Sequence, residues 1–281
     1  MAHSPLAVQR AAPLPERVPV VPGFFGAANP RLLHWKGLRV WLIGASTGIG
    51  AATARALHDR GATVFVSSRS QTTLDELVRG MANARACPLD ATDEREVTRA
   101  ARMIAAEGPL DLVLYCAGHY KPMRAVSMDL EEMRRHLDVN YIGALNVCSA
   151  VVPQLLTQGH GHLSLVSSVA GFHGLPNGLA YGPTKAALTH LAETLHLDLS
   201  VHGVGVSVIH PGFVQTPLTA GNDFTMPALI TPEAAAEAMI EGWAAGRFDI
   251  HFPRRFTLWV KMLRLLPYRV SFPLIHRATG L

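Results

Sequence analysis

The sequence predicts a doubly wound α/β fold, a parallel sheet of about seven strands with helices on both faces. Three observations predict this fold class. From Leu38 onward, short runs rich in β-branched residues alternate with longer stretches of helical period, which is the pattern of βαβ units. The first run ends in a glycine-rich turn before a helical stretch, as in three-layer αβα domains of the Rossmann type. The chain has 281 residues, 49% of them hydrophobic, so it can bury one large core.

Seven short apolar runs are candidate strands. In chain order they are RVWLIG (39–44), TVFVSS (63–68), RACPL (85–89), DLVLYC (111–116), HLSLVSS (162–168), VGVSVIH (204–210) and FDIHF (248–252). Stretches of helical period predict helices after Gly48 and over residues 74–78, 93–107, 130–156, 181–199 and 232–243. The last helix has a well-formed start, because Thr231 supplies a capping hydroxyl, Pro232 suits the first position and Glu233 complements the helix dipole.

The chain divides into three parts, of which residues 38–252 form the single predicted domain. Residues 1–37 hold six prolines and no periodic apolar pattern, which predicts a poorly ordered leader. The prolines and Glu16 argue against a signal or transit peptide. We find no run of eighteen uncharged apolar residues and therefore expect no membrane span. Residues 253–281 form a basic amphipathic extension.

Charge and cysteine patterns narrow the function classes. The formal net charge is +4, but basic residues are spread along the chain without a dense tract before the extension, which argues against a nucleic-acid partner. Cys87, Cys116 and Cys148 lie in apolar runs without metal-ligand spacing, which indicates reduced thiols in a cytoplasmic protein. His160 and His162 lack a third ligand, so we expect no metal.

The turn after the first strand, GASTGIG, carries glycines at Gly44, Gly48 and Gly50. Glycines there permit a tight turn and bring backbone N–H groups and the positive helix end close to a pyrophosphate. A glycine-rich turn without a ligand is the alternative. The strand before it and the helix after it favour dinucleotide binding.

Several motifs in a fixed order resemble the short-chain dehydrogenase/reductase family, and the resemblance runs from about Leu38 to Phe252. They are GASTGIG, Leu89 and Asp90, YCAG at residues 115–118, Asn140 in LDVNYIG, Ser168 in LVSSVAG, YGPTK at residues 181–185 and HPGFVQT at residues 210–216. The resemblance implies a Rossmann-type oxidoreductase that transfers a hydride between a nicotinamide and a carbonyl or alcohol carbon.

The pair Tyr181 and Lys185 is the candidate acid/base. A proline is tolerated only in the first turn of a helix, so Pro183 places the helix start near Tyr181 and Lys185 one turn further along. A phenol titrates near 10 in water, and an adjacent ammonium favours the phenolate. Ser168 precedes Tyr181 by thirteen residues, the spacing of the family, which favours it over Ser167 as the serine that donates to the substrate oxygen.

The resemblance implies four catalytic residues, Asn140, Ser168, Tyr181 and Lys185. Tyr181 would donate a proton, Ser168 a hydrogen bond, and Asn140 would hold a water that extends a proton relay from Lys185. The implied cofactor contacts are Gly44, Ser46, Thr47, Gly48, Ile49, Gly50, Ser68, Arg69, Asp90, Ala91, Cys116, Ala117, Gly118, Tyr181, Lys185, Pro211, Gly212, Val214 and Thr216.

The sequence departs from the family at two places. Ile43 replaces a usual threonine before the first glycine, and Tyr115 and Cys116 replace two asparagines. In the family these polar side chains tie the first strand to the fourth. Because both sides are lost together, we expect an apolar repacking.

NADP(H) is the expected cofactor. An acid at the end of the second strand would bind the ribose 2′-hydroxyl of NAD, but this chain has Ser68 there, followed by Arg69. A small neutral residue and a guanidinium suit a 2′-phosphate.

The substrate is expected to be a small apolar ketone or alcohol. The segments that would line its cleft, residues 172–177 and 213–228, are largely apolar and hold no basic cluster. His119 and His173 either face this cleft or lie in exposed loops. A cofactor-binding sensor or scaffold without turnover is the alternative function, since fold does not entail activity.

Two expectations concern assembly and the extension. The long helices over residues 130–156 and 181–199 predict, by resemblance, a homodimer or homotetramer. Residues 254–281 hold six basic side chains and no acid, and Pro267 should end a helix over residues 256–266. This extension either folds back over the cleft or a subunit contact, or it lies on an anionic membrane and makes the protein a peripheral reductase of a lipid-like ketone.

Overall fold

A computed structural model describes residues 26–222 and 224–279, and it confirms the predicted fold class. Seven strands form one sheet in the order β3-β2-β1-β4-β5-β6-β7, and all neighbours are parallel. The strands are β1 Arg39–Ile43, β2 Thr63–Ser67, β3 Ala84–Ala86, β4 Leu112–Tyr115, β5 His162–Val166, β6 Gly205–Pro211 and β7 Asp249–Phe252. Each corresponds to one of the seven predicted runs.

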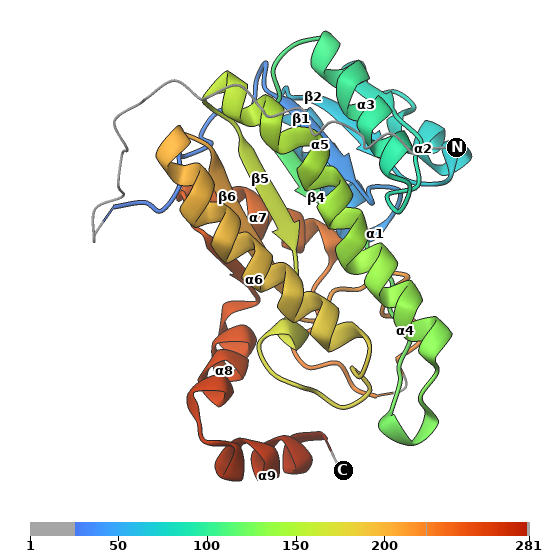
Figure 1. Cartoon of the computed structure of the whole chain (residues 1–281), viewed down its shortest axis with the longest axis vertical. Coiled ribbons are helices and arrows are strands. Elements are labelled where there is room, and N and C mark those ends of the chain that lie inside the picture. The colour runs from blue at the N-terminus through green and yellow to red at the C-terminus, as the bar shows by residue number, and fades with distance from the viewer. Residues whose placement is uncertain (1–25, 223, 280–281) are drawn as a thin grey trace, which may run out of the picture.

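Helices cover both faces of the sheet and bury two apolar layers (Figure 1). The α-helices are α1 Gly48–Asp59, α2 Gln71–Val78, α3 Glu94–Ala106, α4 Leu130–Leu137, α5 Gly143–Gln158, α6 Tyr181–Leu199, α7 Pro232–Ala244, α8 Arg254–Leu265 and α9 Tyr268–Thr279. Short 3-10 turns lie at Ala125–Ser127, Val169–Gly171 and Ser200–His202. Helices α3, α5 and α6 pack on one face, and α1, α2 and α7 on the other.

Side-chain caps explain where several helices begin. Ser70, Asp93, Asp129 and Thr231 each accept a hydrogen bond from a backbone N–H in the first turn of α2, α3, α4 and α7. The predicted start at Thr231 and Pro232 is therefore present.

Helices α4 and α5 form one helical run, Leu130–Gln158, joined by a π-helical turn at Asp138–Ile142. Within the described residues, this run is the one helix long and apolar enough to span a membrane by length and composition alone. Its residues Val147, Val151 and Leu155 are fully buried in the core against the sheet. The α5 part of the run therefore packs on the sheet.

Part of the leader packs on the domain, contrary to the expectation for residues 1–37. The side chain of Asn29 donates to the Val206 carbonyl at 2.8 Å and accepts from the Val206 N–H at 2.9 Å, so it continues the hydrogen bonding of β6. Trp35 is 4% exposed, and its ring meets that of Trp243 edge-on at 5.7 Å. Residues 1–25 lie outside the described residues.

The extension forms two helices where the sequence predicted one. Helix α8 ends at Leu265, close to the expected stop, and α9 begins directly after Pro267. In Figure 1 both lie at the end of the molecule beyond the first turn of α6.

Candidate active site

A cleft of about 660 Å³ opens at the carboxyl ends of the central strands. Strand β1 lies between β2 and β4, so the connection after β1 leaves toward one face of the sheet and the connection after β4 toward the other. The two connections leave a crevice between them at the sheet edge. Doubly wound folds bind their ligands in this crevice. The predicted residues that line it are Gly44, Ser46, Thr47, Gly48, Ile49, Ser68, Arg69, Asp90, Ala91, Cys116, Ala117, Gly118, Ser168, Tyr181, Lys185, Pro211, Gly212, Val214 and Thr216. Gly50 and Asn140 are the two predicted residues that lie behind its wall.

The glycine turn is built to hold an anion. Gly44 has φ +82° and Gly48 has φ +56°, a region that side chains disfavour, and a Cβ at Gly44 would lie 2.3 Å from the Ala117 nitrogen. Thr47 at the N-cap of α1 makes no side-chain capping bond, and the first turn carries no acid. The N-terminal amides of α1 are therefore left for a phosphate.

Gly50 has a packing role instead of a contact with the cleft. A Cβ there would lie 2.4 Å from the Gly44 carbonyl oxygen. The third glycine thus lets α1 approach the turn closely.

The end of β2 presents an unsatisfied polar group to the cleft. The Ser68 hydroxyl oxygen is buried and has no hydrogen-bond partner among the described residues. The exposed Arg69 lines the cleft beside it. A buried hydroxyl without a partner is costly, so this position suits a polar ligand group.

Ser168 and Tyr181 meet at the floor of the cleft. Tyr181 is the first residue of α6, and Ser168 caps the 3-10 turn after β5 by accepting from the Ala170 N–H at 3.2 Å. Ser168 acts on Tyr181 as a side-chain partner that lowers its pKa, so the two side chains lie close together. Ser167 instead donates to the Lys185 carbonyl at 2.7 Å and bonds to the Thr189 hydroxyl, so its side chain faces α6. Of the two serines, Ser168 is the one in contact with Tyr181.

Lys185 lies one helical turn from Tyr181, as its spacing requires. Its ammonium donates to the Val166 carbonyl at 2.8 Å and lies 5.5 Å from the centre of the Tyr181 ring. Burial lowers the pKa of Lys185 to about 8. The side chain is 3% exposed, so the charge is held close to the phenol in a poorly solvated position.

The electrostatics of Tyr181 differ from the expectation. We expected Lys185 to lower the tyrosine pKa, but burial is the largest effect and raises the pKa of Tyr181 above its ordinary value. The side chain of Ser168 acts in the opposite direction. The phenol in this structure is therefore held protonated, the form that donates.

Asn140 is fully buried in the π-helical turn, and all of its amide is engaged. Its Nδ2 donates to the His119 carbonyl and to the Thr184 hydroxyl, both at 3.0 Å, and its Oδ1 accepts from the His119 N–H at 2.7 Å. These bonds fix the segment after β4 against α6. The water that the resemblance implies at Asn140 stays a prediction.

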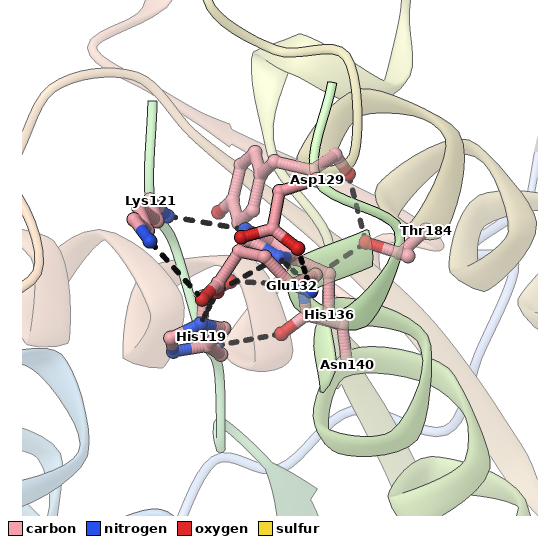
Figure 2. A network of polar contacts seen from close by, with 8 residues as sticks. His119, Lys121, Asp129, Glu132, His136, Asn140 and Thr184 are labelled. Carbon is pink, nitrogen blue, oxygen red and sulfur yellow. Dashed lines mark hydrogen bonds and ion pairs between the residues drawn. The ribbon is translucent and has the colours of Figure 1, made fainter. Parts of the chain in front are cut away.

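Two histidines and a glutamate extend this network (Figure 2). Glu132 is 9% exposed and pairs with His119, and Lys121 approaches its second carboxylate oxygen at 3.5 Å. His136 bonds through Nδ1 to the Glu132 carbonyl at 2.7 Å and accepts the Lys121 N–H on Nε2 at 3.1 Å. The network ties residues 119–121 to α4.

This cluster is also the candidate metal site of the described residues, since ligand atoms of His119, Glu132 and His136 lie within 4.8 Å of one another. Both ring nitrogens of His136 are already engaged: Nδ1 carries a proton that it donates, and the lone pair on Nε2 accepts the Lys121 N–H. Burial lowers the pKa of His136, consistent with the neutral ring that these bonds require. The arrangement is that of a positioning network.

Tyr115 is not part of a purely apolar repacking. Ile43 is buried as expected, but the buried Tyr115 hydroxyl donates to the Val139 carbonyl at 2.5 Å. A Cβ at Gly143 would lie 2.2 Å from that hydroxyl oxygen. The tyrosine thus ties β4 to the π-helical turn that carries Asn140.

The substrate side of the cleft departs from the sequence interpretation. No residue of 172–177 lines the cleft, because Phe172 packs against Val260 of α8 and His173 bonds to Ser271 of α9 at 3.2 Å. His119 pairs with Glu132, and neither histidine lines the cleft. Residues 213–228 contribute Val214 and residues 216–219.

Tyr120 is a lining residue that sequence reasoning missed. Its ring meets the Tyr181 ring edge-on, with centroids 5.0 Å apart. The available signal was its position two residues after the YCAG motif.

Comparisons with known proteins agree with this geometry. The family model described as short chain dehydrogenase matches residues 39–225. An uncharacterized oxidoreductase of Myxococcus xanthus is 38% identical over 80% of this chain and 90% of its own length. One from Staphylococcus epidermidis is 32% identical over 70% and 86%.

Solved structures give the same fold. A short chain dehydrogenase from Burkholderia cenocepacia in complex with NADP aligns with a TM-score of 0.76 at 24% identity, covering 88% of this chain and 98% of that one. A short-chain dehydrogenase/reductase from Mycobacterium ulcerans aligns with a TM-score of 0.72 at 27% identity, covering 78% and 89%.

Proposed function

The chain belongs to the short-chain dehydrogenase family, and on that premise we propose that it transfers a hydride between NADP(H) and a carbonyl or alcohol group of an apolar substrate. The observation that carries the proposal is the convergence of Ser168, Tyr181 and Lys185 on one wall of the cleft. Two relatives, at 38% and 32% identity, are named oxidoreductases.

The nicotinamide supplies the hydride when it is bound. In the reductive direction, the Tyr181 hydroxyl donates a proton to the substrate oxygen, and Ser168 donates a hydrogen bond to the same oxygen. The nearby Lys185 cation stabilises the negative charge that develops on that oxygen or on the phenol. Burial of the pair excludes water, which strengthens these interactions.

Three features of this chain fit a dinucleotide with a 2′-phosphate. The glycine turn leaves the amides of α1 for the pyrophosphate, Ser68 holds an unpartnered hydroxyl, and Arg69 offers a guanidinium. The Burkholderia protein that shares the fold binds NADP in its crystal. NADPH should bind more tightly than NADH, and tighter NADH binding in a direct titration would refute this choice.

Arg69→Gln tests whether this side chain contacts the 2′-phosphate of NADPH or affects the binding of both dinucleotides. We expect it to weaken NADPH binding by about 10- to 150-fold, in line with about 1.5 to 3 kcal/mol for a hydrogen bond to a charged group, and to leave NADH binding unchanged. Arg79→Gln, on the exposed end of α2, is the matched control.

Turnover tests the chemistry. Tyr181→Phe keeps the ring but removes the exchangeable proton, so we expect activity to fall by roughly 10²-fold or more with little change in NADPH affinity. The assay is nicotinamide absorbance with ketones and alcohols of increasing chain length, since Pro217, Leu218 and Tyr120 give the substrate side apolar surface. Retained activity in Tyr181→Phe would contradict the assignment of the proton donor.

A further inference from the structure

Helices α8 and α9 present a large apolar surface to solvent. Nine large apolar side chains with exposed fractions from 37% to 84% lie within seventeen residues of the chain. They are Leu258, Trp259, Met262, Leu265, Leu266, Tyr268, Val270, Phe272 and Leu274, which we call the tail surface. Exposed apolar clusters of this kind mark sites of association.

The tail surface is distinct from the packed side of the same helices. Thr257, Val260 and Leu263 of α8 are buried against the domain, whereas Leu258 and Met262 project from the other side at helical spacing. One side of α8 thus packs on the body of the domain. The other side is left without a partner among the described residues.

Positive charge lies on the same two helices as the tail surface. Five exposed arginines lie in the two helices, and residues 254–281 contain no Asp or Glu. They are Arg254, Arg255, Arg264, Arg269 and Arg277. None of the five forms an ion pair with an acid of the described residues. Exposed apolar side chains and unpaired arginines on the same helices complement a layered surface, one with an apolar interior beneath an anionic outer layer.

The tail surface is anchored to the domain through α8. Lys261 of α8 pairs with Asp249 of β7, and Asp249 accepts from His210 Nδ1 at 2.9 Å. Phe256 packs on the glycine of the cleft wall, since a Cβ at Gly212 would lie 2.9 Å from its ring. An object bound to the tail surface would therefore be placed in a defined orientation beside the cleft.

From these observations we propose that α8 and α9 dock the protein on the interface of an anionic lipid bilayer. The apolar side chains of the tail surface enter the boundary between headgroups and acyl chains, and the arginines contact the anionic headgroups. Neither helix spans the bilayer, because each has twelve residues and carries charge. This binding does not depend on turnover, so its failure would leave the proposed reaction untouched.

Vesicle flotation of the full chain tests the proposal. We expect binding to vesicles of phosphatidylcholine with phosphatidylserine, weak binding to phosphatidylcholine alone, and weakening by salt. Arg264→Gln with Arg269→Gln should reduce affinity about 30-fold, which corresponds to about 1 kcal/mol for each basic residue near an anionic surface. The matched control is Arg79→Gln with Arg95→Gln, two exposed arginines on α2 and α3 that should leave binding unchanged.

Tryptophan fluorescence reports insertion at one site. Trp259 is 46% exposed, whereas Trp35, Trp41 and Trp243 are at most 4% exposed, so Trp259 is the one of the four tryptophans that lipid can reach. We expect a blue shift and quenching by phosphatidylcholine with brominated acyl chains, both abolished by Trp259→Phe.

Three results would overturn the proposal. One is failure of the full chain to float with anionic vesicles. Another is equal binding by the Arg264→Gln, Arg269→Gln variant and its control. The third concerns the double variant Met262→Gln, Leu265→Gln. If light scattering shows that its oligomeric state has changed while its vesicle binding has not, the tail surface would be a contact with a second copy of the chain.

Discussion

Substitutions at Tyr115 and Gly143 should have strongly non-additive effects on the unfolding free energy, because the two residues share one space. The Tyr115 hydroxyl donates to the Val139 carbonyl, and the missing Cβ of Gly143 leaves the room that this hydroxyl occupies. We consider three variants: Tyr115→Phe, Gly143→Ala and the two combined.

The structure sets the expected sizes. Tyr115→Phe removes one buried hydrogen bond and should cost about 1 to 3 kcal/mol. Gly143→Ala gains about 1 kcal/mol of helix propensity, but its Cβ would lie 2.2 Å from the hydroxyl oxygen. Such overpacking costs about 1 to 3 kcal/mol or more. In the double variant that clash is gone, while contacts of 3.3 Å to Ala91 remain. The double variant should therefore lose about 2 kcal/mol less than the sum of the single losses, within the range of contacting residues.

The assay is urea unfolding followed by circular dichroism, at one protein concentration so that assembly does not shift the midpoint. Additive losses, within about 0.5 kcal/mol, would refute the reasoning. Additivity would mean that the tyrosine hydroxyl and the glycine do not share the space in solution.

Three further predictions concern the site and the assembly. Glu132→Gln keeps the shape of the side chain but removes the charge that pairs with His119. Because small misplacements of catalytic groups lower turnover, kcat should fall about 10-fold while NADPH affinity is kept. An unchanged kcat would contradict a positioning role for Glu132. Burial lowers the pKa of Lys185 from 10.5 to about 8, so between these pH values the unfolded chain binds the extra proton. The unfolding free energy of the wild type should then rise with pH relative to Lys185→Met across this window, and a constant difference would refute the pKa direction. We also expect a dimer or tetramer through α5 and α6, and a monomer by light scattering at micromolar concentration would contradict it.

Local pattern was enough to predict the fold, the glycine turn and the Tyr181–Lys185 pair, while most other residues of the candidate site came from the resemblance of the motifs. Strands and helices follow from apolar periodicity within single segments, and the glycine turn and the start of α6 follow from Gly44, Gly48 and Pro183. Tyr181 and Lys185 are four residues apart in one helix, so their proximity needs no knowledge of the rest of the chain. The parallel order of the strands then brings the predicted cofactor residues to one edge of the sheet.

Contacts between distant segments could not be predicted in this way. Asn29 meets Val206 across 177 positions, and His119 meets Glu132 across a loop whose path no local pattern specifies. The raised pKa of Tyr181 depends on burial, which is a property of everything packed around the side chain. Periodicity and turn chemistry act within a few residues, whereas desolvation, hydrogen-bond completion and close packing depend on which segments the folded core brings together.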